Sequence, residues 1–132
     1  MFTLAVSDHV MIAHSFPDPF FGPAQRLHGA TYAIDLEVRA TSLGPHDVVM
    51  DIGELRRVLR GVLSDLEYRN LDEHPAFRGL MSTTERVAER IAHRAAERLA
   101  LLAADAAPVA GASVRVVVRE SPLAYASYER AI

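Results

Sequence analysis

Two histidines, His14 and His28, have the type and spacing that best suit metal or acid–base chemistry in this sequence. Neutral imidazoles are usual ligands of zinc, and imidazole titrates nearest to neutral pH. His14 ends one predicted strand and His28 begins the next, so a hairpin would bring them together beside a proline-rich loop. Zinc takes three or four protein or water ligands. Two histidines alone are therefore a weak zinc signal, and structural or surface histidines are the alternative.

The remaining histidines give weaker signals. His9 lies five residues before His14, an odd offset that turns it to the other face of a strand. His46, His74 and His93 fall in a predicted turn, loop and helix, where we expect exposure to solvent.

Several other side chains could contact a ligand. Glu120 ends an apolar strand, where its carboxylate could accept two N–H donors from a ring with an amidine-like edge. Thr83 and Thr84 could also bind a ligand, although helix capping explains their position equally well. Glu67 and Tyr68 leave the first predicted helix together and could act as general base and acid. The alternative for each of these residues is a solvated element end.

Composition excludes several kinds of chemistry. The chain has no cysteine, which removes disulfides, thiolate metal sites and thiol nucleophiles. All 14 basic residues are arginine, so Schiff-base catalysis and a lysine-containing P-loop are also excluded. The formal net charge of −3 gives no broad attraction to nucleic acid or to an anionic membrane.

The sequence also predicts a location. No apolar run approaches the roughly 18–20 residues of a membrane span. The first ten residues lack the basic start of a secretory signal, so we expect a cytoplasmic protein.

Alternation of apolar and polar residues predicts the two strands that position the histidines. They cover residues 1–16 and 27–40, and the loop between them contains three prolines and a glycine within residues 16–23. One face of the second strand is apolar, so we expect an antiparallel hairpin with one face toward solvent.

Two amphipathic helices are predicted next. Asp51 is a good N-cap for the first, whose apolar stripe extends to Leu66. An irregular segment, 68–80, follows. The second helix is expected to begin at Ser82–Glu85, which has capping-box spacing, and to end near Ala104.

The last predicted elements are strands at 114–119 and 123–128. The order of strand, strand, helix, helix, strand and strand is typical of the α+β class. With 132 residues, we expect a single domain that covers residues 1–132.

Specific segments occur in the same order in a known family. They are His14, Leu27–Tyr32, Val49–Ile52, Leu66–His74, Thr83–Glu85 and Arg119–Ser121. In these segments the chain resembles the 6-pyruvoyl-tetrahydropterin synthase / 6-carboxy-tetrahydropterin synthase family over nearly its whole length. The resemblance implies the tunnelling fold, or T-fold. This fold is an antiparallel four-stranded sheet with two helices on one face, and its subunits oligomerise as trimers or hexamers around a barrel.

The resemblance also implies roles for individual residues. The family binds zinc through one histidine on the first strand and both histidines of a His-Gly-His motif on the second. His14 and His28 match two of these ligands, whereas Ala30 replaces the third. Ala24 stands where the family has a catalytic cysteine, and Glu67–Tyr68 stands where it has an Asp-His pair.

The ligand-binding positions of the family are better preserved. Glu120 matches the glutamate that anchors the pterin, and Thr83 and Thr84 match the threonines at the start of a helix. In this family the active site lies between subunits, so the resemblance also implies a homo-oligomer with a small-molecule substrate.

Three functions follow from this pattern. The leading hypothesis is an enzyme of the tetrahydropterin synthase type with an altered active site. It would be a lyase or isomerase for a pterin-like or related heterocycle, with His14 and His28 as metal ligands and Glu67 and Tyr68 as catalytic groups. One alternative is a catalytically inactive heterocycle-binding or assembly protein of the same fold. The other is the classical 6-pyruvoyl or 6-carboxy synthase activity.

Overall fold

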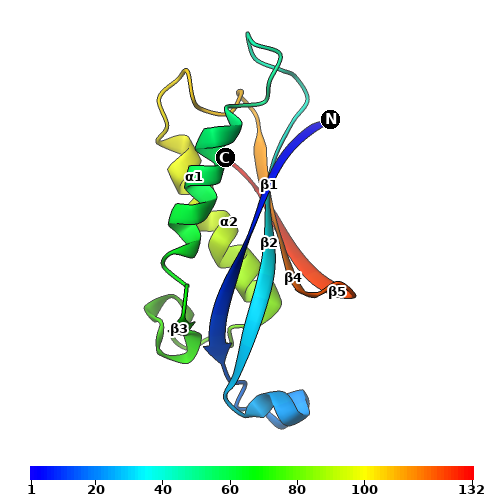
Figure 1. Ribbon diagram of the computed structural model, residues 1–132, viewed down its shortest axis with the longest axis vertical. Coiled ribbons are helices and arrows are strands. Elements are labelled where there is room, and N and C mark those ends of the chain that lie inside the picture. Colours follow the sequence, from blue (N-terminus) through cyan, green and yellow to red (C-terminus); the bar gives the residue numbers. More distant parts are fainter.

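Two long strands form a hairpin at the centre of the computed structural model, which describes residues 1–132 (Figure 1). The strands are β1 (Phe2–His14), β2 (His28–Ala40), β3 (Arg69–Asn70), β4 (Ser113–Ser121) and β5 (Ala124–Ala131). The helices are α1 (Ile52–Leu63) and α2 (Thr84–Ala100), with short 3₁₀ helices η1 (Pro19–Gln25), η2 (Leu71–Glu73) and η3 (Pro75–Phe77). The predicted α+β class is confirmed.

The sheet has the strand order β3-β1-β2-β4-β5. The pairs β1–β2, β2–β4 and β4–β5 are antiparallel, which confirms the predicted four-stranded antiparallel sheet. The fifth strand, β3, has only two residues and runs parallel to β1. The sequence could not predict it, because two residues are too few to show a period.

The core lies between the sheet and the two helices, which cover one face (Figure 1). The apolar side chains of β2 point into it: Tyr32, Ile34, Leu36 and Val38 are each at most 1% exposed. The apolar faces of the helices pack on them, and their fully buried members include Leu55, Leu59, Leu63, Ile91 and Leu99. Neither helix is long and apolar enough to cross a membrane.

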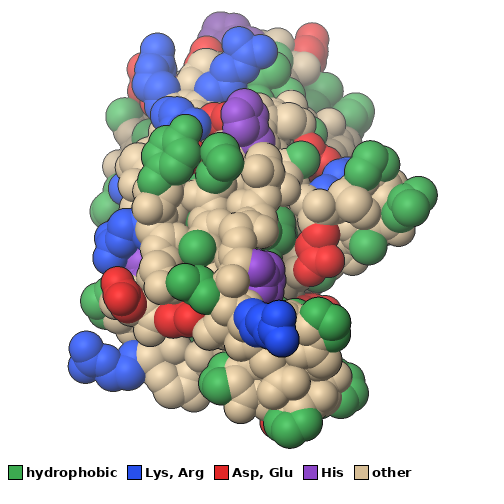
Figure 2. All heavy atoms as spheres, turned by 60° about the horizontal axis from the view of Figure 1, so that its bottom comes forward, with side chains coloured by type: hydrophobic (Ala, Val, Ile, Leu, Met, Phe, Trp, Pro, Cys, Tyr) green, Lys and Arg blue, Asp and Glu red, His purple; other side chains and the backbone are tan.

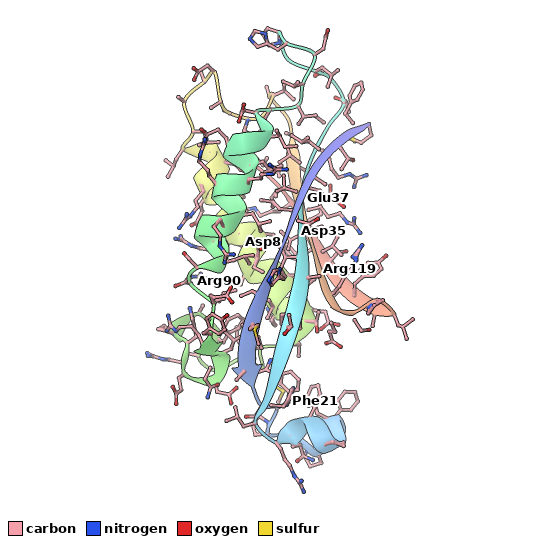
Figure 3. All side chains as sticks on the ribbon, viewed as in Figure 1. Asp8, Phe21, Asp35, Glu37, Arg90 and Arg119 are labelled. Carbon is pink, nitrogen blue, oxygen red and sulfur yellow. The ribbon has the colours of Figure 1, made fainter.

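The other face of the sheet carries no helix and is polar. Asp35 pairs with Arg119 at 3.3 Å, and Glu37 pairs with Arg115 at 3.0 Å. In Figure 3, Asp35, Glu37 and Arg119 lie along β2 and β4. The predicted alternation of core-facing and solvent-facing residues in β2 is therefore confirmed.

The helix ends follow the predicted capping residues with one correction. Asp51 caps α1 by accepting a hydrogen bond from the Glu54 amide at 2.8 Å. Thr83, not Ser82, caps α2, and its hydroxyl accepts from the Arg86 amide at 3.3 Å. The Ser82 side chain instead turns into the core, so the predicted capping box lies one residue too early. α2 also ends at residue 100 rather than 104, and β5 extends to residue 131.

Candidate functional site

His14 and His28 meet at the open end of the hairpin. His14 is the last residue of β1 and His28 is the first residue of β2, and they lie directly opposite each other. Their ring centroids are 4.6 Å apart. His14 is only 3% exposed, whereas His28 is partly exposed. The predicted proximity of the two imidazoles is confirmed.

Backbone carbonyl groups fix the orientation of both rings. Nδ1 of His14 lies 3.0 Å from the Ser82 carbonyl oxygen and 3.1 Å from its hydroxyl, and Nδ1 of His28 lies 2.7 Å from the Arg26 carbonyl oxygen. A carbonyl oxygen can only accept a hydrogen bond, so these partners assign the proton to Nδ1 in each neutral ring. Each Nε2 atom then keeps its lone pair for a metal or a proton.

Burial keeps the His14 imidazole neutral. Desolvation is the largest cause that lowers its pKa below the ordinary value of 6.5, and the nearby His28 lowers it further. The carbonyl group of Ser82 and the carboxylates of Asp72 and Glu120 oppose this shift without cancelling it. At neutral pH His14 is therefore an uncharged ligand or base.

This shift predicts a pH dependence of stability. Below the unfolded pKa, near 6.5, the unfolded chain binds a proton at His14 that the folded chain does not bind. The free energy of unfolding therefore decreases as the pH is lowered. A His14→Asn variant, whose amide can still donate to Ser82, should lose less stability between neutral pH and about pH 5.5. Urea unfolding at both pH values measures this. The His46→Asn variant, which changes an exposed histidine, is the control. An equal loss of stability in wild type and His14→Asn would contradict the prediction.

A second group of side chains lies at the start of α2. The Thr84 hydroxyl is buried and donates a hydrogen bond to the Glu120 carboxylate. Tyr32 also contacts Thr84, and burial raises the pKa of its phenol to about 12. Glu120 is exposed at the end of β4, where the pairing with β5 shifts between Arg119 and Ser121. Such irregularities re-aim side chains at strand ends.

The two groups face a common space. The charge of Glu120 acts on both His14 and Tyr32. Figure 2 shows a hollow between two lobes of the surface, with histidine and acidic side chains along its walls. Four of the predicted site residues therefore come together, namely His14, His28, Thr84 and Glu120. Thr83 serves as the α2 cap.

Glu67 and Tyr68 lie elsewhere, at the outer edge of β1. The Tyr68 amide donates to the Met11 carbonyl group at 2.8 Å, and the Glu67 carboxylate accepts from the Met11 amide at 3.3 Å. Glu67 also pairs with Arg60 at 3.2 Å, and the Tyr68 side chain is 80% exposed. Since β1 and β2 separate this edge from β4, one chain alone does not bring these residues to Glu120.

Sequence reasoning missed two contributors to the site. Ser82 orients His14 from 68 positions away, and its place before a helix suggested only a cap. Tyr32 has the alternation of a core residue, and nothing in its spacing indicated that its hydroxyl reaches Thr84.

His74 corrects the expectation of an exposed loop histidine, because it is only 5% exposed. Its Nδ1 accepts from the Ala76 amide at 3.0 Å, and its Nε2 donates to the Asp65 carboxylate at 3.1 Å. Both ring nitrogens are therefore engaged, and His74 fastens the segment between α1 and α2.

The residues present complete only part of a zinc site. The free Nε2 atoms of His14 and His28 suit two positions around a tetrahedral ion. Ala30 points to the same face of β2 as His28 but has no donor atom. No group of three histidine, cysteine, aspartate or glutamate side chains in the chain could hold a metal ion. Any further ligand would have to come from water, a substrate or another subunit.

Comparison with known proteins agrees with this fold. The family model described as 6-pyruvoyl tetrahydropterin synthase matches residues 3–131. The chain is 28% identical to the 6-carboxy-5,6,7,8-tetrahydropterin synthase of Bacillus subtilis, over 96% of this chain and 84% of that protein. The fold is similar to that of 6-pyruvoyl tetrahydropterin synthase from Caenorhabditis elegans, with a TM-score of 0.76 and 22% identity over 98% and 95% of the two chains. The corresponding Plasmodium vivax structure gives a TM-score of 0.73 at 20% identity, with 98% of each chain covered. The chain therefore belongs to the 6-pyruvoyl tetrahydropterin synthase family.

Proposed function

We propose that this chain is an enzyme of the tetrahydropterin synthase type that binds a pterin-like heterocycle and acts on it as a lyase or isomerase. The observation that carries the proposal is the Thr84–Glu120 hydrogen bond beside two imidazoles with free Nε2 atoms. This arrangement places a carboxylate acceptor and two imidazole rings around one hollow. Because Ala24 and Ala30 replace a catalytic cysteine and a zinc-binding histidine of the family motif, we expect a reaction different from the one that the complete motif implies.

Glu120 is suited to bind the N–H edge of such a ring. Thr84 occupies one lone pair of the carboxylate and fixes its orientation. An ionised carboxylate has about four acceptor positions, so it can still take two adjacent N–H donors. Hydrogen bonds to a charged acceptor are about twice as strong as neutral ones.

The imidazole pair would face the part of the ring where bonds change. The Nε2 atom of His14, whose residue is only 3% exposed, can accept a proton. Zinc, if bound with ligands from outside the chain, would polarise a substrate oxygen there. His14 and His28 would be its protein ligands.

We further propose that the active form is a homo-oligomer, a trimer or a hexamer. Most of the outer edge of β1 has no partner strand, and at the opposite side of the sheet the outer edge of β5 has none either. β5 runs antiparallel to β1, so the β5 edge of one subunit can continue the sheet onto β1 of the next. This pairing would bring Glu67 and Tyr68 of one subunit toward Glu120 of its neighbour, and it would also remove two open edges.

Two measurements with the wild-type protein test the proposal. Saturable quenching of pterin fluorescence on titration with the protein is expected, and its absence would contradict the binding function. Incubation with dihydroneopterin triphosphate tests the classical activity, for which triphosphate release is the readout. We expect binding of pterin without that release.

Glu67 and Tyr68 are proposed as base and acid across the interface. Glu67→Gln and Tyr68→Phe should each reduce turnover of the substrate about 100-fold, in the usual range for a lost acid–base group, with little change in pterin affinity. Glu97→Gln, which changes an exposed carboxylate on the solvent face of α2, is the matched control. Unchanged turnover in both variants would remove these residues from the mechanism.

A second candidate is a heterocycle-binding protein without turnover. The ion pair between Glu67 and Arg60 favours it, because that pair holds the carboxylate at its own strand edge. Pterin binding with no product from any pterin-like substrate would identify this function.

A further inference from the structure

A series of aromatic rings leads from the buried histidine to the surface. The centroid of Phe16 lies 4.5 Å from that of His14, the Phe21 ring lies 4.7 Å from Phe16, and the Phe20 ring lies 5.1 Å from Phe21. Exposure rises along this series. Phe16 is 9% exposed, Phe21 is partly exposed, and Phe20 is 87% exposed.

The loop that carries these rings is held by hydrogen bonds. The Asp18 carboxylate accepts from the Phe20 amide at 2.9 Å, and its carbonyl group accepts from the Phe21 amide at 3.0 Å. The Phe16 amide donates to the Ala24 carbonyl group at 3.1 Å and closes the loop. Phe20 is therefore held on an ordered turn, although nothing in the chain covers its ring.

The geometry leaves the face of the Phe20 ring free. The planes of Phe20 and Phe21 meet at 89°, so the two rings do not stack and Phe20 keeps a flat apolar surface for another partner. In Figure 3, Phe21 lies between η1 and the strands, and the turn that joins β4 to β5 lies higher than η1 and to its right. Glu120 is at the end of β4, next to that turn.

We propose that Phe20 is a ring-stacking residue that selects a flat, aromatic heterocycle over a reduced, puckered one. The inference rests on the proposed function, because Glu120 would bind the N–H edge of the same ring. The free face of Phe20 supplies the apolar contact that the carboxylate cannot. Stacking of a planar base on an aromatic side chain is worth about 1–3 kcal/mol, or roughly 5- to 150-fold in affinity.

The test compares four proteins in the same fluorescence titration with pterin, and the affinity for tetrahydropterin, which does not fluoresce, is measured by its displacement of bound pterin. Phe20→Ser should raise the dissociation constant for pterin about tenfold and that for tetrahydropterin much less. Phe20→Tyr keeps the ring and should bind like wild type. Leu101→Ser, which replaces an 85% exposed leucine beyond the end of α2, is the control for removal of a surface apolar group. The oligomeric state of each variant is measured by light scattering.

The outcomes distinguish a failure of the proposed function from a failure of the role of Phe20. If wild type does not bind pterin, the proposed function is wrong and this inference fails with it. If wild type binds but Phe20→Ser has the same affinity and the same preference for the flat ring, only the role of Phe20 is wrong. Dissociation of the oligomer in Phe20→Ser would also overturn the inference, because the ring would then be a subunit contact.

Discussion

Replacement of Ala30 with histidine is expected to raise the zinc content of the purified protein from well below one ion to about one ion per chain. Ala30 lies two residues after His28 on the same face of β2, and it is opposite Ile12 on β1. His14 is therefore a diagonal neighbour of position 30 across the hairpin. A third imidazole at this place would supply the three-histidine set that holds zinc with one position open.

The expected gain in zinc affinity is large. Loss of a residue that only orients a ligand lowers metal affinity about 10- to 100-fold, and a direct ligand should have at least the upper value. Elemental analysis at known subunit concentration measures the change. Ala5→His, on the exposed face of β1, adds the same side chain away from His14 and is the control. Zinc well below one ion per chain in Ala30→His as well as in wild type would show that the two existing imidazoles are not placed for a metal.

The hairpin that carries this site could be predicted from the sequence alone. Alternation in two strands and a proline-rich loop between them predicted that β1 and β2 pair, and hence that His14 lies near His28, which the structure places directly opposite it. Local signals were sufficient for this proximity, because the facing of side chains follows from a period of two and both histidines lie where their strands meet the connecting loop.

The other half of the site depends on contacts that no local pattern contains. His14 meets Ser82 across 68 positions, and Thr84 meets Glu120 across 36. Both contacts arise because α2 begins over the end of the sheet, a packing arrangement that strand and helix periods do not specify. The resemblance to a family implied that Thr84 and Glu120 both belong to the ligand-binding positions, but it did not indicate that Ser82 turns inward.

The same limit explains the error at His74. A histidine between two helices, in a segment with no period, is normally solvated. Here Asp65 and the Ala76 amide form hydrogen bonds with both ring nitrogens, so the ring can be buried without an unsatisfied polar atom. Such pairing can be recognised only when the fold has placed the partners.

Glu120→Gln is expected to weaken pterin binding by about 100-fold. The glutamine side chain has nearly the same shape, so the strand end should keep its structure. It lacks the charge, however, and its amide N–H₂ group would face the N–H donors of the ring. Hydrogen bonds to charged groups contribute about 1.5–3 kcal/mol each, and two of them are lost or weakened.

Two further variants distinguish recognition from orientation. Thr84→Val keeps the shape of the threonine but removes the hydroxyl that holds the carboxylate, so it should weaken binding about tenfold, less than Glu120→Gln. Glu129→Gln, on the helix-free face beside Arg39, should bind pterin like wild type. Fluorescence titration measures all three. If Thr84→Val and Glu120→Gln both bind like wild type, the ring does not lie against the end of β4. A larger loss in Thr84→Val than in Glu120→Gln would instead make the threonine the principal contact, with the carboxylate as its support.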